Sequence, residues 1–110
     1  MKTLSYQQLK QMKDQKEDFL LINVLPAEKV EEACIPGSMH IPLEQSGFED
    51  LVEGAAVDKQ EKIVIYSENF DCTAARRATE NLDNAGFSNV YAYEGGTQEW
   101  QEKSQARVAA

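Results

Sequence analysis

The sequence predicts an α/β fold in which a mostly parallel sheet of about five strands is covered by helices on both faces. Residues 62–66 form a short apolar run rich in β-branched side chains, which is typical of a strand buried on both faces. A polar loop and then a helical stretch, residues 74–85, follow this run and end at Gly86. Strands alternate with helices along the rest of the chain. At 110 residues, we expect positions 1–110 to form a single domain.

The first part of the chain predicts a helix and then a strand. Ser5 and Gln8 have the spacing of a capping box, which opens a helix running to about Lys16. Residues 19–24 are predicted to form a strand. Further elements are a short helix over 27–33 after Pro26, a turn at 35–37, a short strand over 39–41, a short helix over 48–53, the strand and helix named above, a strand over 89–93 and a last helix from Thr97.

Composition narrows the function classes. The formal net charge of −8 disfavours nucleic acid and anionic membranes, because it repels phosphates and leaves no basic stripe. The N-terminus lacks a signal-type apolar run, and we therefore expect a cytoplasmic protein that does not contact a membrane. Cys34 and Cys72 are interpreted as reduced thiols. Their spacing supports neither a disulfide nor a metal site, and no cofactor is predicted.

Three segments, in the same order, resemble the single-domain rhodanese family of persulfide-forming sulfurtransferases. Residues 20–24 (LLINV) resemble the family's first core strand, and residues 34–42 (CIPGSMHIP) resemble its His-Ile-Pro-Gly segment. Residues 85–91 (AGFSNVY), followed by Glu-Gly-Gly at 94–96 and by Trp100, resemble its closing signature. The resemblance covers nearly the whole chain. It implies the rhodanese-like three-layer fold and a nucleophilic cysteine at the end of the strand over 62–66.

The departures from the family pattern fall at the functional positions. Ser67 occupies the place of the nucleophilic cysteine, and Asn23-Val24-Leu25 replaces the common Asp-Val-Arg. Asn23 would keep a hydrogen bond without the charge. The loop is about two residues longer than the commonest form and resembles a Cys-x4-Cys variant, of which Cys72 remains.

The loop after the strand over 62–66 is a candidate anion site, because unpaired amides at a helix N-terminus favour negative charge. Glu68 and Asp71 oppose such binding by repulsion. Arg76 and Arg77 are possible anion contacts, although about 100° separates neighbours on a helix and both cannot face the loop equally. The alternative is a solvated helix face or a salt bridge of one of them to nearby Glu80. The candidate loop consists of Ser67, Glu68, Asn69, Phe70, Asp71, Cys72 and Thr73.

Ser67 and Cys72 differ in the reactions that their side chains can perform. A serine nucleophile needs an activating base, yet His40, the one histidine, belongs to a structural turn-and-strand segment. Serine cannot carry a persulfide, and it commonly hydrogen-bonds backbone in such a loop. Cys72 lies just before a helix, where the dipole favours a thiolate, so it is a possible sulfur carrier or else an inert thiol. A phosphatase-like Cys-x4-Arg cradle ending at Arg77 would require unwinding the first helical turn.

The preferred interpretation is a rhodanese-like domain with weak or absent thiosulfate:cyanide transfer, acting as a binding or regulatory module or as a sulfur relay through Cys72. Two alternatives stay open. Cys72 carries the sulfane sulfur of an active sulfurtransferase, or Ser67 replaces the catalytic cysteine of an ordinary rhodanese. In the last case, Ser67→Cys would restore activity. The partners implied are a small thiosulfate-like anion or a protein sulfur donor or acceptor.

Overall fold

A five-stranded parallel sheet forms the centre of the molecule, with the strand order β1-β5-β4-β2-β3. The computed structural model describes residues 2–26, 35–43 and 46–109. The strands are β1 (Lys2–Thr3), β2 (Leu20–Asn23), β3 (Met39–His40), β4 (Ile63–Tyr66) and β5 (Val90–Tyr93). The predicted parallel sheet is confirmed. The sequence missed β1, because a two-residue exposed strand carries no hydrophobic pattern.

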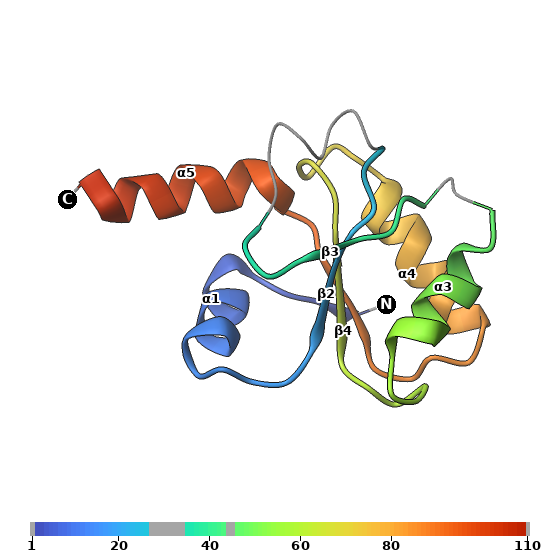
Figure 1. Ribbon diagram of the computed structural model, residues 1–110. Coiled ribbons are helices and arrows are strands. Elements are labelled where there is room, and N and C mark those ends of the chain that lie inside the picture. Colours follow the sequence, from blue (N-terminus) through green and yellow to red (C-terminus); the bar gives the residue numbers. More distant parts are fainter. Residues whose placement is uncertain (1, 27–34, 44–45, 110) are drawn as a thin grey trace.

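Helices cover both faces of the sheet, which confirms the three-layer arrangement (Figure 1). On one side lie α1 (Tyr6–Asp14) and α5 (Gly96–Ala109), and on the other lie α3 (Phe48–Ala55) and α4 (Ala74–Asn84). The capping box at the start of α1 is confirmed, since Ser5 Oγ accepts from the Gln8 amide at 3.1 Å and Gln8 Oε1 accepts from the Ser5 amide at 2.9 Å. The helix predicted over 27–33 lies outside the described residues.

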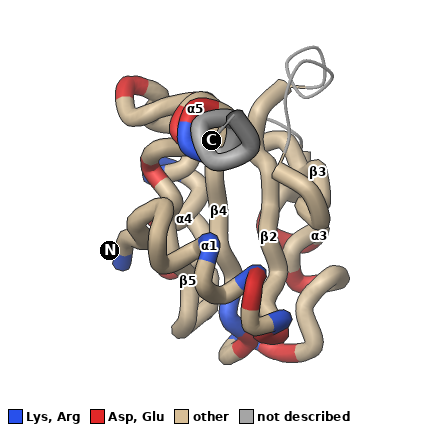
Figure 2. The backbone as a smooth tube through the Cα atoms, turned by 90° about the vertical axis from the view of Figure 1, so that its left-hand side faces the viewer, with Lys and Arg blue, Asp and Glu red and all other residues tan. Residues whose placement is uncertain are grey.

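Two hydrophobic clusters, one on each face, hold the layers together. Successive residues of β4 point alternately to the two faces. Ile63 and Ile65 pack with α3 and α4, whereas Val64 and Tyr66 pack with α1 and with Trp100 of α5. Figure 2 shows β2 and β4 side by side without a charged residue along them, as the burial of both faces requires. None of the described helices is long and apolar enough to cross a membrane.

The topology brings the ends of β2 and β4 together. The two strands pair in register from Leu20 with Ile63 to Asn23 with Tyr66, and the Val24 amide continues the ladder to the Tyr66 carbonyl at 3.1 Å. Parallel strands leave the sheet at the same edge, so the loops after β2 and β4 adjoin there. This carboxyl edge is where open α/β sheets bind ligands.

Candidate active site around Cys72

The loop over residues 67–73 is fixed to the first turn of α5. The Ser67 carbonyl accepts from the Thr97 amide at 3.0 Å, and the Glu68 carbonyl accepts from the Gln98 amide at 2.9 Å. Gly96 has a φ of +63°, and a Cβ there would lie 2.4 Å from the Ser67 carbonyl oxygen. The glycine is therefore needed both for its left-handed backbone and for this close approach.

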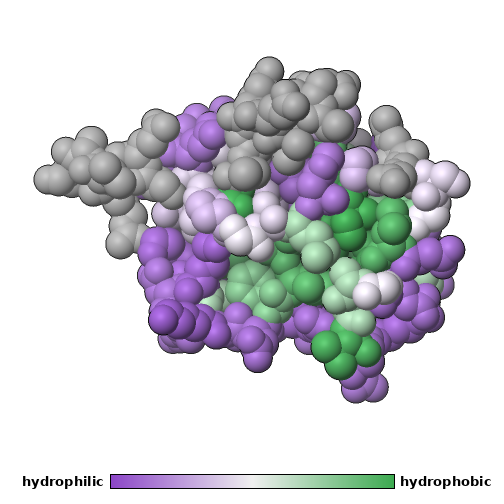
Figure 3. All heavy atoms as spheres, in the orientation of Figure 1, coloured by the Kyte–Doolittle hydropathy of each residue, from purple (hydrophilic) through white to green (hydrophobic). Residues whose placement is uncertain are grey.

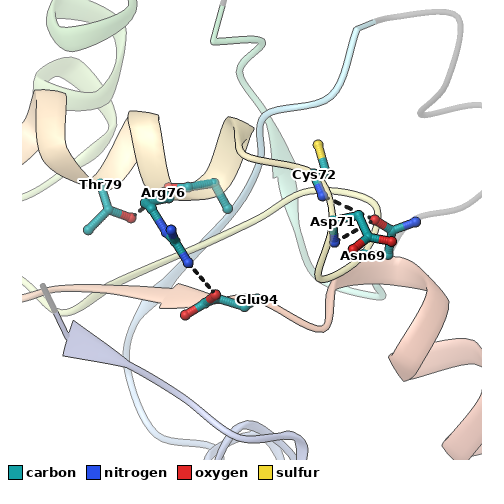
Figure 4. Close-up of polar contacts among 7 residues, drawn as sticks. Asn69, Asp71, Cys72, Arg76, Thr79 and Glu94 are labelled. Atoms are coloured by element: carbon teal, nitrogen blue, oxygen red, sulfur yellow. Dashed lines mark hydrogen bonds and ion pairs between the residues drawn. The ribbon is translucent and has the colours of Figure 1, made fainter.

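Asn69 organises the outer part of the loop (Figure 4). Its Oδ1 accepts from the backbone amides of Asp71 at 3.0 Å and Cys72 at 3.1 Å, which is an Asx-type turn. Its Nδ2 donates to Gln98 Oε1 at 3.1 Å. These two backbone amides belong to the loop that the sequence predicted as an anion site, and they donate within the loop instead. Phe70, at the tip, is 65% exposed.

The Cys72 thiol is partly buried and lies among three hydrogen-bond donors that act on its pKa. Burial acts to raise the pKa of Cys72, but hydrogen bonds from the Ser67 side chain and from the amides of Ala74 and Glu68 outweigh it, and the pKa is lowered. The Glu68 charge opposes this shift and is the smallest contribution. The loop therefore stabilises a thiolate on its own cysteine, as a helix N-terminus with additional donors should.

Ser67 lies beneath this thiol rather than at the surface. It is 1% exposed and is not among the residues that line the neighbouring pocket. Thr73 is the residue before α4, and its side chain makes no capping hydrogen bond. The Arg77 amide donates to the Thr73 carbonyl at 2.9 Å, so the first turn of α4 is wound and does not form a Cys-x4-Arg cradle.

A pocket of about 260 Å³ opens beside Cys72 at the carboxyl edge of the sheet. One wall consists of apolar residues that follow β2 and β3, and the other comes from the loop and the start of α4. In the first wall are Val24, Leu25, Pro26, Pro42 and Leu43, and in the second are Glu68, Cys72, Thr73, Ala74 and Arg77. On the face seen in Figure 3, hydrophobic atoms gather in the region of β3 and α3.

The two adjacent arginines of α4 have different environments. Arg77 lines the pocket. Arg76 points away from it and donates to Glu94 Oε2 at 3.0 Å (Figure 4). The salt bridge to Glu80 is thus replaced by one to Glu94, which β5 brings close although it lies far away in the sequence. Of the two predicted anion contacts, Arg77 is the one beside Cys72.

A buried hydrogen-bond network supports the apolar wall. Asn23 Oδ1 accepts from the Leu25 amide at 2.8 Å, and Asn23 Nδ2 donates to the Tyr66 hydroxyl at 3.2 Å. The same hydroxyl donates to Ser38 Oγ at 2.7 Å and accepts from the Ile35 amide at 3.0 Å. Asn23 therefore keeps hydrogen bonds without a charge, as predicted.

His40 has a structural contact rather than a catalytic one. Its Nε2 lies 2.6 Å from the Leu25 carbonyl, which makes that nitrogen a donor and ties β3 to the end of the apolar wall. Among the described residues, no three His, Cys, Asp or Glu side chains gather as a metal site would require. Cys34 lies outside the described residues.

The sequence did not identify Tyr66 as part of the site, and it did not identify an apolar wall there. A tyrosine at the last position of a buried strand was the available signal, because a buried hydroxyl needs a hydrogen-bond partner. The sequence marked Leu25 only as the residue in place of the family's arginine, and Pro42 and Leu43 carry no chemical signal of their own. All three become lining residues because the loops after β2 and β3 adjoin.

Comparisons with known proteins bear on the family and the fold of this chain. The model of the rhodanese-like domain family matches residues 5–103. The chain is 33% identical over 109 residues to the mouse thiosulfate sulfurtransferase/rhodanese-like domain-containing protein 3, covering 90% of this chain and 68% of the relative. It is 31% identical over 81 residues to the thiosulfate sulfurtransferase GlpE of Pseudomonas savastanoi, covering 74% of this chain and 71% of that protein.

Solved structures show the same fold. The BH2092 protein of Bacillus halodurans superposes with a TM-score of 0.80 at 24% identity, covering 94% of this chain and 73% of that one. The human single-domain sulfurtransferase TSTD1 gives a TM-score of 0.75 at 22% identity, covering 94% and 97% of the two chains. At these identities, the structural likeness concerns the fold alone.

Proposed function

Because this chain belongs to the rhodanese-like domain family, we propose that it transfers sulfane sulfur through a persulfide on Cys72 and that its turnover of thiosulfate with cyanide is weak. The observation that carries the proposal is the convergence of three hydrogen-bond donors on the Cys72 thiol, which lowers its pKa beside an open pocket. The thiolate is the nucleophilic form of cysteine, so this environment favours attack on a sulfur donor.

The reaction proposed for Cys72 has two balanced steps. The thiolate attacks the terminal sulfur of a donor persulfide, the donor's S–S bond breaks, and the electron pair leaves with the donor as a thiolate. Cys72 then carries the persulfide. An acceptor thiolate attacks its outer sulfur, takes it, and regenerates the Cys72 thiolate, so no external oxidant or reductant is required.

Ser67 is assigned the role of a donor to this sulfur. Its hydroxyl cannot hold sulfane sulfur, and its burial beneath Cys72 suits a fixed hydrogen bond better than attack on a substrate. In this proposal, the nucleophile is Cys72, five residues after the family's nucleophile position. Ser67, which occupies that position, supports Cys72 as a hydrogen-bond donor. Weak use of thiosulfate follows from the Glu68 carboxylate at the pocket, which repels a dianion.

A protein-binding role is the second candidate, and the exposure of Phe70 favours it. A phenyl ring that is 65% exposed at the tip of the loop offers apolar contact area to a partner within a few residues of Cys72. Such a partner would be a protein sulfur donor or acceptor, or a target that the domain regulates. The two candidate functions are compatible, since a relay through Cys72 needs a partner to approach this loop.

Sulfur loading on the folded protein tests the proposal. We expect brief exposure to sodium polysulfide to add one sulfur atom to Cys72, located by peptide mapping in a mass spectrometer. Addition of N-acetylcysteine should remove it. Cys72→Ser should abolish the rapid phase of loading, whereas Cys34→Ser should retain it. Rapid loading that follows Cys34, or equal loading of both thiols, would contradict the assignment and leave the binding role.

A further inference from the structure

The pocket beside Cys72 has an apolar wall that is fixed in place. Val24 and Leu25 are 2% and 4% exposed, so packing and the hydrogen bond from the Leu25 amide to Asn23 hold them. Pro42 and Leu43 extend the wall, and the Leu43 amide donates to the Val24 carbonyl at 3.2 Å. A ligand that reaches the sulfur must therefore leave water along one side and contact hydrocarbon instead.

The charged groups of the described lining balance one another. Arg77 supplies one cation and Glu68 one carboxylate, while Arg76 is engaged with Glu94 outside the pocket. Thiosulfate carries two negative charges and is strongly hydrated, so burial beside hydrocarbon requires more compensation than a single guanidinium gives. The Glu68 carboxylate and the Cys72 thiolate repel it further. A singly charged donor faces a much smaller penalty.

We propose that this pocket takes a sulfane-sulfur donor with an apolar organic body and a single negative charge, in preference to thiosulfate. The inference rests on the proposed function of Cys72 and specifies its donor. The organic body lies against the wall of Leu25, Pro42 and Leu43, and the negative group pairs with Arg77. Organic thiosulfonates and organic persulfides share this chemistry.

The transfer from either donor balances. With a thiosulfonate, Cys72–SH and R–SO2–S⁻ give Cys72–S–SH and R–SO2⁻, since the donor's S–S bond breaks and its electron pair leaves with the sulfinate. With a persulfide, Cys72–SH and R–S–S⁻ give Cys72–S–SH and R–S⁻. In both reactions a sulfur atom with six valence electrons passes to the Cys72 thiolate, and the thiol proton ends on the new persulfide.

A comparison of donors tests this preference. The folded protein is exposed to equal concentrations of benzenethiosulfonate, benzyl persulfide or thiosulfate, and loading of Cys72 is followed by intact mass. Each rate is divided by the rate of N-acetylcysteine with the same donor, which removes differences in intrinsic reactivity. We expect the normalised rate for both organic donors to exceed that for thiosulfate by at least about tenfold.

Paired variants locate the preference in the pocket. Arg77→Gln should lower the normalised rate for the organic donors, whereas Arg76→Gln, one residue away and outside the pocket, should leave it unchanged. Leu43→Ser should reduce the ratio of organic donor to thiosulfate. Val57→Ser serves as its control, because Val57 is 89% exposed and does not line the pocket. Circular dichroism and a thermal melt establish that each variant is folded.

The outcomes separate this inference from the function on which it rests. Loading by thiosulfate at the same normalised rate as by the organic donors would overturn the preference and leave Cys72 as the sulfur carrier. Loading by one organic donor alone would support the preference and assign that source. Failure of every donor, polysulfide included, to load Cys72 in folded protein would overturn both.

Discussion

The loops that follow β2 and β4 adjoin at one edge of the sheet, yet different interactions hold them. Val24 and Leu25, after β2, are buried in the core and form a hydrocarbon wall. The loop from Ser67 to Cys72, after β4, is held by hydrogen bonds that Asn69 Oδ1 accepts and by others that the first turn of α5 donates. The first loop owes its position to packing and the second to polar contacts. We therefore expect a substitution in the first loop to weaken ligand binding, and a substitution in the second to change the pKa or the reactivity of the Cys72 thiol.

The substitution with the largest expected effect is Ser67→Cys. The Ser67 side chain acts on the Cys72 thiol closely enough to lower its pKa, and we expect a thiol at position 67 to form a disulfide with Cys72 on oxidation. We expect oxidised Ser67→Cys to lose alkylation of Cys72 by about 100-fold or more, and reduction to recover it. Peptide mapping with iodoacetamide measures both states.

The same variant decides between the two candidate nucleophile positions. If Cys72 is the carrier, the reduced variant should gain no thiocyanate production from thiosulfate and cyanide, because the new thiol is buried and outside the pocket. Turnover that rises to that of an active rhodanese would instead support Ser67 as the replaced catalytic residue.

The second substitution, Gly96→Ala, attacks the anchor of the loop after β4. The methyl group would meet backbone 2.4 Å away and adopt a φ of +63°, so we expect a loss of about 3 kcal/mol in the free energy of unfolding. Cys72 alkylation should slow in the remaining folded protein. Gly47→Ala is the matched control, because Gly47 has a φ of +78° and no atom of the described residues lies within 4 Å of the added Cβ. It should cost about 1 kcal/mol. Equal losses would show that the contact with Ser67 is unimportant.

The third substitution, Tyr66→Phe, tests the polar support of the wall after β2. It removes a hydroxyl that bonds with Asn23, Ser38 and the Ile35 amide in a buried site, and we expect a loss of about 2 kcal/mol in the free energy of unfolding. Chemical denaturation measures the loss. The rate of Cys72 alkylation should stay within about twofold, because the hydroxyl that is removed bonds with Asn23, Ser38 and the Ile35 amide at the support of the wall.

Tyr93→Phe provides the control for that removal of a buried hydroxyl. The Tyr93 hydroxyl is buried without a hydrogen-bond partner in acceptable geometry. Burial, followed by the nearby Glu99 carboxylate, raises the pKa of Tyr93, but Glu99 is held by Lys103 at 3.1 Å. The loss of this hydroxyl should therefore leave the free energy of unfolding unchanged or raise it slightly. A similar loss in the free energy of unfolding for both variants would show that the hydrogen-bond network of Tyr66 adds nothing to stability.

The sequence predicted the packed parts of the molecule better than the polar ones. The apolar run of β4 and the helical pattern of α4 follow from the periodicity of burial, and the capping box of α1 follows from its spacing. Asn69 was named as a loop residue without a role, because its contacts depend on where α5 begins in space. Glu94 was missed as the partner of Arg76, since β5 brings it close only after the sheet forms. A sequence pattern predicts local structure and burial, whereas contacts between residues far apart in the sequence are known only once the fold is known.

The smallest expected effect is on the pH dependence of the thiol, and it isolates one hydrogen bond in the loop after β4. The lowered pKa of Cys72 means that the rate of iodoacetamide alkylation should reach half its maximum below pH 9.0, the ordinary value for a thiol. Ser67→Ala removes a donor to the thiolate, so the charged form loses stabilisation and the midpoint should move to higher pH. Ser67→Thr keeps a hydroxyl and should move it less. Alkylation at neutral pH should be slower in Ser67→Ala, while the plateau at high pH changes little. A midpoint that stays in place would mean that the amides of Ala74 and Glu68 hold the thiolate without help from Ser67.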